Sequence, residues 1–179
     1  MSDCFISYIL VTYIVNIGKN IIPTMLGAGE KMMAYSFEGY WKDVGTIDSL
    51  WEANMDILGE DPVLKLHDGK HRVLSRHENA PPQYVGPNAV IENASITEGC
   101  EILGTVKNSV LGENVRVLEG AVVEDAVIMG DCIIHEGAHV SYAIIDRDVR
   151  ICKGAVVGKP KQEAKGITVI GEGVVIEEN

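Results

Sequence analysis

The sequence is poor in positive charge. Its 179 residues contain 15 Lys and Arg against 26 Asp and Glu, which gives a formal net charge of −11 at pH 7. Proteins that bind nucleic acids use a basic surface to displace counterions from phosphates, and proteins held on anionic lipids carry a comparable basic patch. The acidic balance therefore argues against a nucleic-acid partner and against a membrane-surface partner.

The sequence also lacks the marks of an exported or membrane-spanning protein. Its four cysteines are scattered without a Cys-x-x-Cys pair, which favours a reduced, cytoplasmic protein. The longest apolar run, Phe5–Ile17, has 13 residues and no basic residue before it. A membrane-spanning helix needs about 20 apolar residues, and a secretory signal needs a basic start. We interpret this run as one or two buried strands, with a transmembrane segment as the alternative.

Aromatic residues are scarce at 6%, whereas glycine occurs 19 times, a balance that favours turns and β-structure over a helical bundle. Through the second half of the chain, aliphatic residues recur every five or six positions, and the pattern repeats every 17. Its members are Leu111, Val117, Val123, Ile128, Ile134, Val140, Ile145, Ile151 and Val157. Gly120, Gly137 and Gly154 keep the same spacing. The repeat predicts a triangular parallel β-helix with one inward aliphatic residue per side and glycine at a corner.

Small residues are expected to point inward as well, four positions after each inward aliphatic residue. They are Val115, Ala121, Val127, Cys132, Ala138, Val149 and Ala155. The flanking coils are less regular. Aligning Ile96 with Val117 predicts an insertion loop over residues 103–107, and aligning Ile170 with Ile151 predicts that residues 158–162 bulge out. The last coil has no capping helix, so we expect a partner to cover it.

The part of the chain before residue 79 shows mixed α and β patterns. A helix is predicted after the N-cap Thr46, with Asp48 in its first turn and Gly59 beyond its end. The other elements expected here are a short helix at 19–26, strands at 32–37 and 40–44, and a hairpin of residues 63–66 and 72–74. Residues 79–84 have the composition of a linker.

The string Phe37-Glu38-Gly39-Tyr40-Trp41-Lys42-Asp43-Val44-Gly45-Thr46, together with residues 50–56 and 81–87, resembles the bacterial glucose-1-phosphate adenylyltransferases (ADP-glucose pyrophosphorylases). The resemblance extends from about Gly18 to the C-terminus. It implies a Rossmann-like nucleotidyltransferase domain followed by a left-handed parallel β-helix. On this basis residues 1–78 are a C-terminal remnant of the first domain, with residues 1–16 atypical. Residues 79–84 are the linker, and residues 85–179 are the β-helix domain.

The resemblance also implies a reaction of glycogen biosynthesis, in which ATP and glucose 1-phosphate give ADP-glucose and pyrophosphate with Mg²⁺. It makes Asp43 a Mg²⁺ ligand and places Trp41 beside the sugar. For Asp43, the alternative is a capping or orienting role in the turn before the helix. Lys42 would face phosphate or, as a simpler alternative, solvent.

Two elements of that family are missing from these residues. Its Gly-rich phosphate loop has no counterpart except Gly27-Ala28-Gly29, which no Arg follows, and its sugar-phosphate Glu-Lys pair is not found. We therefore expect a C-terminal fragment of the enzyme that is inactive alone. The alternative is a non-catalytic regulatory or oligomerisation subunit, assembled as a homo- or hetero-oligomer through the β-helix.

A third reading is a hexapeptide-repeat acyltransferase. Those enzymes share the triangular helix and use a histidine between subunits, a role open to His135 or His139. His135 and Cys152 should also be outward neighbours on adjacent coils, as in a Cys–His pair. Cys100 and Cys132 are expected to be inert core thiols.

A cluster of His67, Asp68, His71 and His77 has no standard metal-site spacing. It is a weak candidate for a metal site.

Overall fold

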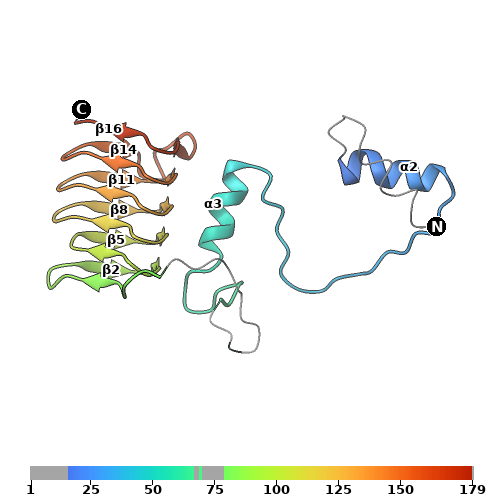
Figure 1. Ribbon diagram of the computed structural model, residues 1–179, viewed down its shortest axis with the longest axis horizontal. Coiled ribbons are helices and arrows are strands. Elements are labelled where there is room, and N and C mark those ends of the chain that lie inside the picture. The colour runs from blue at the N-terminus through green and yellow to red at the C-terminus, as the bar shows by residue number, and fades with distance from the viewer. Residues whose placement is uncertain (1–15, 67–68, 70–78, 179) are drawn as a thin grey trace. The chain divides into compact units, whose positions relative to one another are not determined.

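The computed structural model describes residues 16–66, 69 and 79–178. The chain forms two compact units, Met1–Gly39 and Tyr40–Asn179, and each is considered by itself. In the first unit a π-helical turn, η1 (Ile17–Ile21), leads into α2 (Ile22–Gly27) (Figure 1). The helix predicted over residues 19–26 is thereby confirmed, and it begins two residues earlier.

The Asn16 side chain caps the start of η1. Its Oδ1 accepts a hydrogen bond of 2.8 Å from the backbone N–H of Lys19, which satisfies a donor that has no partner within the helix. Pro23 lies in the first turn of α2, directly after the π-helical turn η1.

The segment between α2 and α3 contains no strand, so the strands predicted at 32–37 and 40–44 are wrong for this chain. Alternating side chains favour an extended backbone, but a strand exists only where a neighbour supplies the hydrogen-bond ladder. Among the described residues no strand lies beside this segment. The side chains of Met33, Tyr35 and Phe37 are accordingly exposed.

Helix α3 (Ile47–Met55) begins at the predicted N-cap. The Thr46 hydroxyl accepts a hydrogen bond of 3.2 Å from the Ser49 N–H, and the Ser49 hydroxyl accepts one of 3.0 Å from the Thr46 N–H. This reciprocal capping box satisfies two backbone donors. Asp48 lies in the first turn, and Gly59 takes a left-handed conformation (φ 98°) beyond the helix end. The prediction of this helix is confirmed.

Residues 84–176 form a parallel β-helix of three sheets, which confirms the mainly β fold class (Figure 1). The first sheet contains β1 (Tyr84–Val85), β4 (Glu101–Ile102), β7 (Arg116–Val117), β10 (Ile133–Ile134), β13 (Arg150–Ile151) and β16 (Val175–Ile176). The second contains β2 (Val90–Glu92), β5 (Thr105–Lys107), β8 (Val122–Glu124), β11 (His139–Ser141) and β14 (Val156–Gly158). The third contains β3 (Ser95–Ile96), β6 (Val110–Leu111), β9 (Val127–Ile128), β12 (Ala143–Ile145) and β15 (Thr168–Ile170).

All nine aliphatic residues of the 17-residue repeat are buried in one continuous core. The register shows why: Val117, Ile134 and Ile151 stand opposite one another in successive coils, and the other two columns stack in the same way. Like residues therefore lie above like residues along the axis.

The second inward set is right except for Val127. The step from Val123 to Ile128 is five residues instead of six. The second inward position within it is therefore Ala126, which belongs to the core. Val127 points to the other face because successive strand residues alternate. The place of Ala126 is taken by Ala143 in the next coil and by the buried Ser109 in the previous one.

Left-handed residues turn the corners, as predicted for Gly120, Gly137 and Gly154, whose φ angles lie between 68° and 71°. The other two corners use residues that tolerate this conformation. One is formed by Asn114, Asp131 and Asp148, and the other by Asn93, Asn108, Asp125 and Tyr142. Asn and Asp adopt left-handed angles more readily than most residues.

The alignments of the flanking coils are corrected by the observed register. Ile96 stands opposite Leu111, not Val117. The predicted loop at 103–107 is wrong, because Thr105–Lys107 is strand β5 and Val106 is buried. This coil is two residues shorter than the regular ones.

At the other end, Ile170 stands opposite Ile145 and Ile176 opposite Ile151. The predicted bulge is confirmed from residue 159 on, whereas Gly158 still belongs to β14, and it is larger than expected because no strand interrupts residues 159–167. We call residues 159–167 the insertion loop.

Two remaining predictions fall partly outside the described residues. Residues 5–15 of the apolar run and residues 72–74 of the hairpin lie outside them, while residues 63–66 form no strand. In the predicted linker, residues 79–83 are irregular and Tyr84 already begins β1. Within the described part of the chain, no helix combines the length and apolar character needed to cross a membrane.

Candidate functional site

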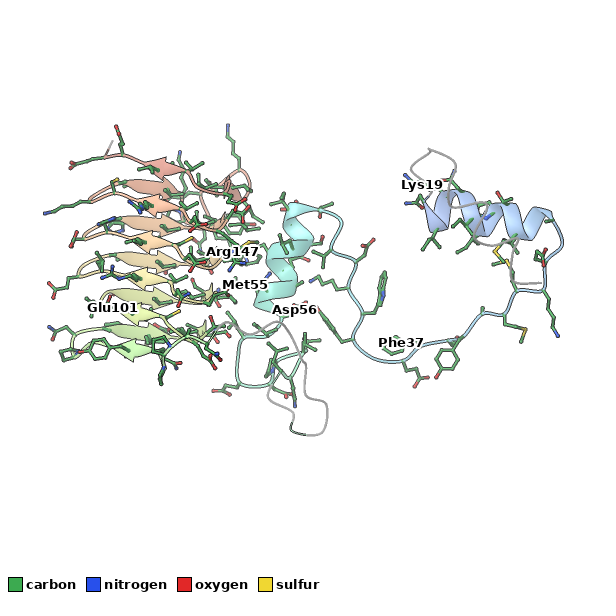
Figure 2. All side chains as sticks on the ribbon, viewed as in Figure 1. Lys19, Phe37, Met55, Asp56, Glu101 and Arg147 are labelled. Atoms are coloured by element: carbon green, nitrogen blue, oxygen red, sulfur yellow. The ribbon has the colours of Figure 1, made fainter. Side chains whose placement is uncertain are left out.

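The motif segment Tyr40–Asp43 is fastened to the end of α3 by one carboxylate. Asp56 Oδ2 accepts hydrogen bonds of 3.0 Å from both Tyr40 Oη and Lys42 Nζ. Lys42 Nζ also lies 3.1 Å from Glu52 Oε2. Figure 2 shows Asp56 just beyond α3. The two residues on either side of Trp41 are therefore held against the helix.

This arrangement changes the ionisation of its members. The hydrogen bond from Lys42 holds the pKa of Asp56 below its usual value, and the bond to Asp56 raises the pKa of Lys42. Partial desolvation, followed by the bond to Asp56, raises the pKa of Tyr40. Lys42 is a half-buried partner of two carboxylates, so the prediction of a solvated lysine is wrong.

The side chains of Trp41 and Asp43 are left accessible by these contacts. Trp41 is 75% exposed, and Asp43 is exposed. Among the residues that the structure describes, Asp43 forms no hydrogen bond or ion pair. The alternative capping role is filled by Thr46 with Ser49. The assignments of Trp41 to the sugar and of Asp43 to Mg²⁺ remain predictions.

A complete metal site is not formed by the described residues: no group of three or more His, Cys, Asp or Glu side chains among them could hold an ion. The histidines at 67, 71 and 77, with Asp68, lie outside the described residues.

Gly27-Ala28-Gly29 does not have the position of a phosphate loop. It lies at the C-terminal end of α2, with Gly27 as the last helical residue and Gly29 at φ 70° in the turn after the helix. Phosphate loops precede a helix, because the positive end of the helix dipole is at its N-terminus. This glycine pair therefore only ends the helix.

Helix α3 docks on an outward apolar patch of the third sheet. Trp51 is 6% exposed and packs with Val127 and Ile144, which point away from the core of the β-helix. Its Nε1 donates a 2.8 Å hydrogen bond to the backbone oxygen of Asp125. The sequence analysis gave no indication of the patch that Trp51 covers.

A ladder of corner side chains extends this attachment. Asn93 Oδ1 accepts a 2.8 Å hydrogen bond from the Gly59 N–H, and Asn93 Nδ2 donates a 2.8 Å bond to Asn108 Oδ1. Asn108 Nδ2 in turn donates to Asp125 Oδ1. The corner therefore holds the chain both at Trp51 and beyond the end of α3. The recurrence of Asn or Asp at these corners was the sequence signal that could have revealed the ladder.

The candidate Cys–His pair is supported only by the neighbouring positions of the two residues. His135 and Cys152 are neighbours across adjacent coils, since Ile134 stands opposite Ile151. No hydrogen bond joins their side chains among the described residues, and the His135 Nδ1 faces Glu136 at 3.9 Å. His139 is exposed.

The predicted core thiols are confirmed, because Cys100 and Cys132 are both buried. Burial raises the pKa of Cys100 and raises the pKa of Cys132 to about 11. The thiolate is the reactive form, so these two cysteines are unreactive near neutral pH.

Cys132 should make the fold sensitive to alkali. Because its pKa is about 11 in the folded chain and 9.0 ordinarily, its neutral form stabilises the fold fully below pH 9, and this contribution is lost as the pH rises to 11. We expect a loss of about 2–3 kcal/mol of unfolding free energy from this group. Urea unfolding at pH 8 and pH 10.5 measures most of this loss, about 2 kcal/mol, because pH 10.5 is still below the pKa in the folded chain.

Cys132→Val is the matched variant, since Val115 and Val149 occupy the same inward place in the adjacent coils. The variant should lose clearly less stability over this pH interval. An equal loss in both proteins would contradict the assignment.

Comparisons with known proteins match both parts of the chain. Residues 82–176 match the family described as GlmU-like, C-terminal hexapeptide, and residues 15–60 match the family described as nucleotidyl transferase. The hexapeptide match fits a left-handed β-helix.

Curated relatives include proteins named glucose-1-phosphate adenylyltransferase from Bacillus mycoides (strain KBAB4), Bacillus cereus (strain ATCC 10987) and Bacillus thuringiensis (strain Al Hakam). Each is 44% identical over 156 residues, which cover 87% of this chain and 41% of the relative. The chain therefore spans about two fifths of the length of the relatives that it matches.

Proposed function

The chain belongs to the GlmU-like C-terminal hexapeptide family, and we propose that it supplies the C-terminal part of a glucose-1-phosphate adenylyltransferase. The reaction would convert ATP and glucose 1-phosphate into ADP-glucose and pyrophosphate. The main support is one continuous match to Bacillus enzymes of that name, which spans 156 residues at 44% identity. A hexapeptide domain alone would match many unrelated enzymes, whereas this match extends well beyond the β-helix.

The proposed contribution of this chain to the site is the exposed pair Trp41 and Asp43. Trp41 would present its ring to the sugar, and Asp43 would offer one oxygen ligand to a divalent cation, which we take to be Mg²⁺. Such a cation neutralises phosphate charge and takes only one or two protein carboxylates. Because the described residues form no complete metal site, we derive no catalytic step from the ion.

The Tyr40–Asp56–Lys42 contacts have a clear task in this proposal. Catalysis of a displacement at phosphorus depends mainly on positioning and charge stabilisation. By fixing the residues before and after Trp41, Asp56 limits the conformations open to the motif. The segment is thus oriented by α3 before any substrate arrives.

The proposal predicts that the chain alone does not convert ATP and glucose 1-phosphate into ADP-glucose. Joining it to the N-terminal part of a related enzyme should give an active protein. The test fuses the part of the Bacillus cereus enzyme that precedes the match to this chain from Gly18 onward. Pyrophosphate release from ATP and glucose 1-phosphate with Mg²⁺ is then measured. We expect activity in the fusion and at least about a tenfold loss of kcat/KM in its Asp43→Asn variant, because a ligand to the bridging cation is removed.

Asp48→Asn in the same fusion is the matched control, since it removes a carboxylate from the first turn of α3 and should leave turnover nearly unchanged. Rapid synthesis of ADP-glucose by the 179-residue chain alone would contradict the proposal. An inactive fusion, with co-purification of the chain and a full-length enzyme, would favour the regulatory-subunit alternative.

We also propose that the β-helix assembles with other subunits. Val169 and Val175 on the last described coil are exposed, and exposed apolar side chains of this kind favour association with another subunit. The cytoplasm is the proposed compartment, because Cys100, Cys132 and Cys152 are all free, as expected of a reducing environment.

A further inference from the structure

The insertion loop reaches back to α3. Its Lys161 Nζ lies 4.4 Å from the centre of the Trp51 ring and 5.8 Å from that of Tyr142. The loop is folded by a turn at Pro160, whose backbone oxygen accepts bonds from the N–H groups of Glu163 and Ala164 at 2.8 and 3.0 Å. The lysine is therefore presented by a closed turn and not by an open chain.

Tyr142 is unusual for its position. The equivalent corner residues of earlier coils are Asn93, Asn108 and Asp125, whereas Tyr142 adopts φ 46° with a bulky side chain. Bulky residues at positive φ are strained and point to a specific role. Its ring meets Trp51 edge-on, with centroids 5.2 Å apart and an interplanar angle of 79°.

We propose that Lys161 and Tyr142 form a clamp on Trp51, and that Lys161 is a positioning residue for the Trp41–Asp43 segment. The connection is short. Trp51 belongs to α3, and the carboxylates that hold Lys42 lie on and just after the same helix. Fixing α3 on the third sheet thus fixes the support of the motif. The role of the clamp in positioning catalytic groups rests on the proposed function, whereas the contacts of Lys161 and Tyr142 with Trp51 do not.

The clamp explains why the coil is enlarged at this place. Trp51 already has Val127 and Ile144 beneath it and a hydrogen bond to Asp125. The regular corner of the preceding coil already places Tyr142 against the indole, and the insertion loop adds Lys161 as a second side chain beside it. The insertion supplies a cation, which is attracted to the negative face of an aromatic ring.

The test uses the complete 179-residue chain and amide hydrogen exchange of α3. In Lys161→Gln we expect the amides of residues 50–55 to exchange about two- to fivefold faster, the ratio expected for loss of a partly exposed cation–π contact. Lys161→Arg should restore slow exchange, because guanidinium also binds aromatic faces. Lys159→Gln and Lys165→Gln, in the same loop, should leave the rate unchanged.

Tyr142→Asn separates a clamp from a general structural role. Asparagine suits the left-handed corner better than tyrosine, so the melting temperature of the β-helix should stay the same or rise. The exchange of α3 should nevertheless become faster. If Tyr142→Asn lowered the melting temperature of the β-helix as well as the protection of α3, the clamp would be overturned. Equal exchange rates in Lys161→Gln and Lys159→Gln would also overturn it. Neither measurement needs turnover, so failure here is distinct from failure of the proposed reaction.

Discussion

Ile134→Ala is expected to lower the unfolding free energy of the β-helix by about 2–5 kcal/mol, the range found for truncation of buried aliphatic residues. Ile134 is fully buried, and its backbone stands between those of Val117 and Ile151 in the adjacent coils. Strands from both sides fix its position, so the cavity left by alanine cannot collapse easily. Urea unfolding followed by circular dichroism measures the loss.

The same strand provides the matched control. Ile133 precedes Ile134 in β10 and points outward, where it is only partly buried. Ile133→Ala removes the same atoms from the same strand, yet should cost no more than about 1 kcal/mol because less apolar surface leaves a packed environment. Similar losses for the two variants would contradict the assignment of the two faces.

The success of the repeat analysis has a simple cause. In a β-helix each coil contacts its neighbours along the chain, so the period of the core is the period of the sequence. Leu111, Ile128 and Ile145 could be identified for this reason. Val127 was assigned wrongly because a rule of four residues after each aliphatic residue fails where the next aliphatic residue, Ile128, is only five positions after Val123. Counting two positions back from each aliphatic residue gives Ala126 and Ser109 correctly.

Features that depend on distant contacts could not be predicted in the same way. Trp51 covers Val127 and Ile144, which lie more than 70 positions further along the chain. No local sequence pattern connects them to Trp51. The strands expected before α3 failed for a related reason, since extended segments need partners that the sequence pattern does not specify. In the motif, Lys42 was expected to face phosphate or solvent, whereas its structural partners are Asp56 and Glu52.

Trp51→Ala is expected to release α3 from the β-helix. The truncation removes the buried indole, its hydrogen bond to Asp125 and its contact with Tyr142, at a cost of about 3–5 kcal/mol. A helix of nine residues is not stable alone in water, since isolated helices need about 12–15 residues even to be marginal. Amide exchange over residues 47–55 should therefore become about 100-fold faster or more, while the strands stay protected.

Trp41→Ala is the matched control for Trp51→Ala. Trp41 is in the same segment of chain but is 75% exposed, so its loss should leave exchange in α3 unchanged. The two tryptophans then report different things: Trp51 reports docking of the helix, and Trp41 reports the surface that the helix orients. If Trp51→Ala left α3 protected, Asn93 and the corner ladder would be the principal attachment. If both variants released the helix, Trp41 would be a packing residue and its proposed place beside the sugar would be untenable.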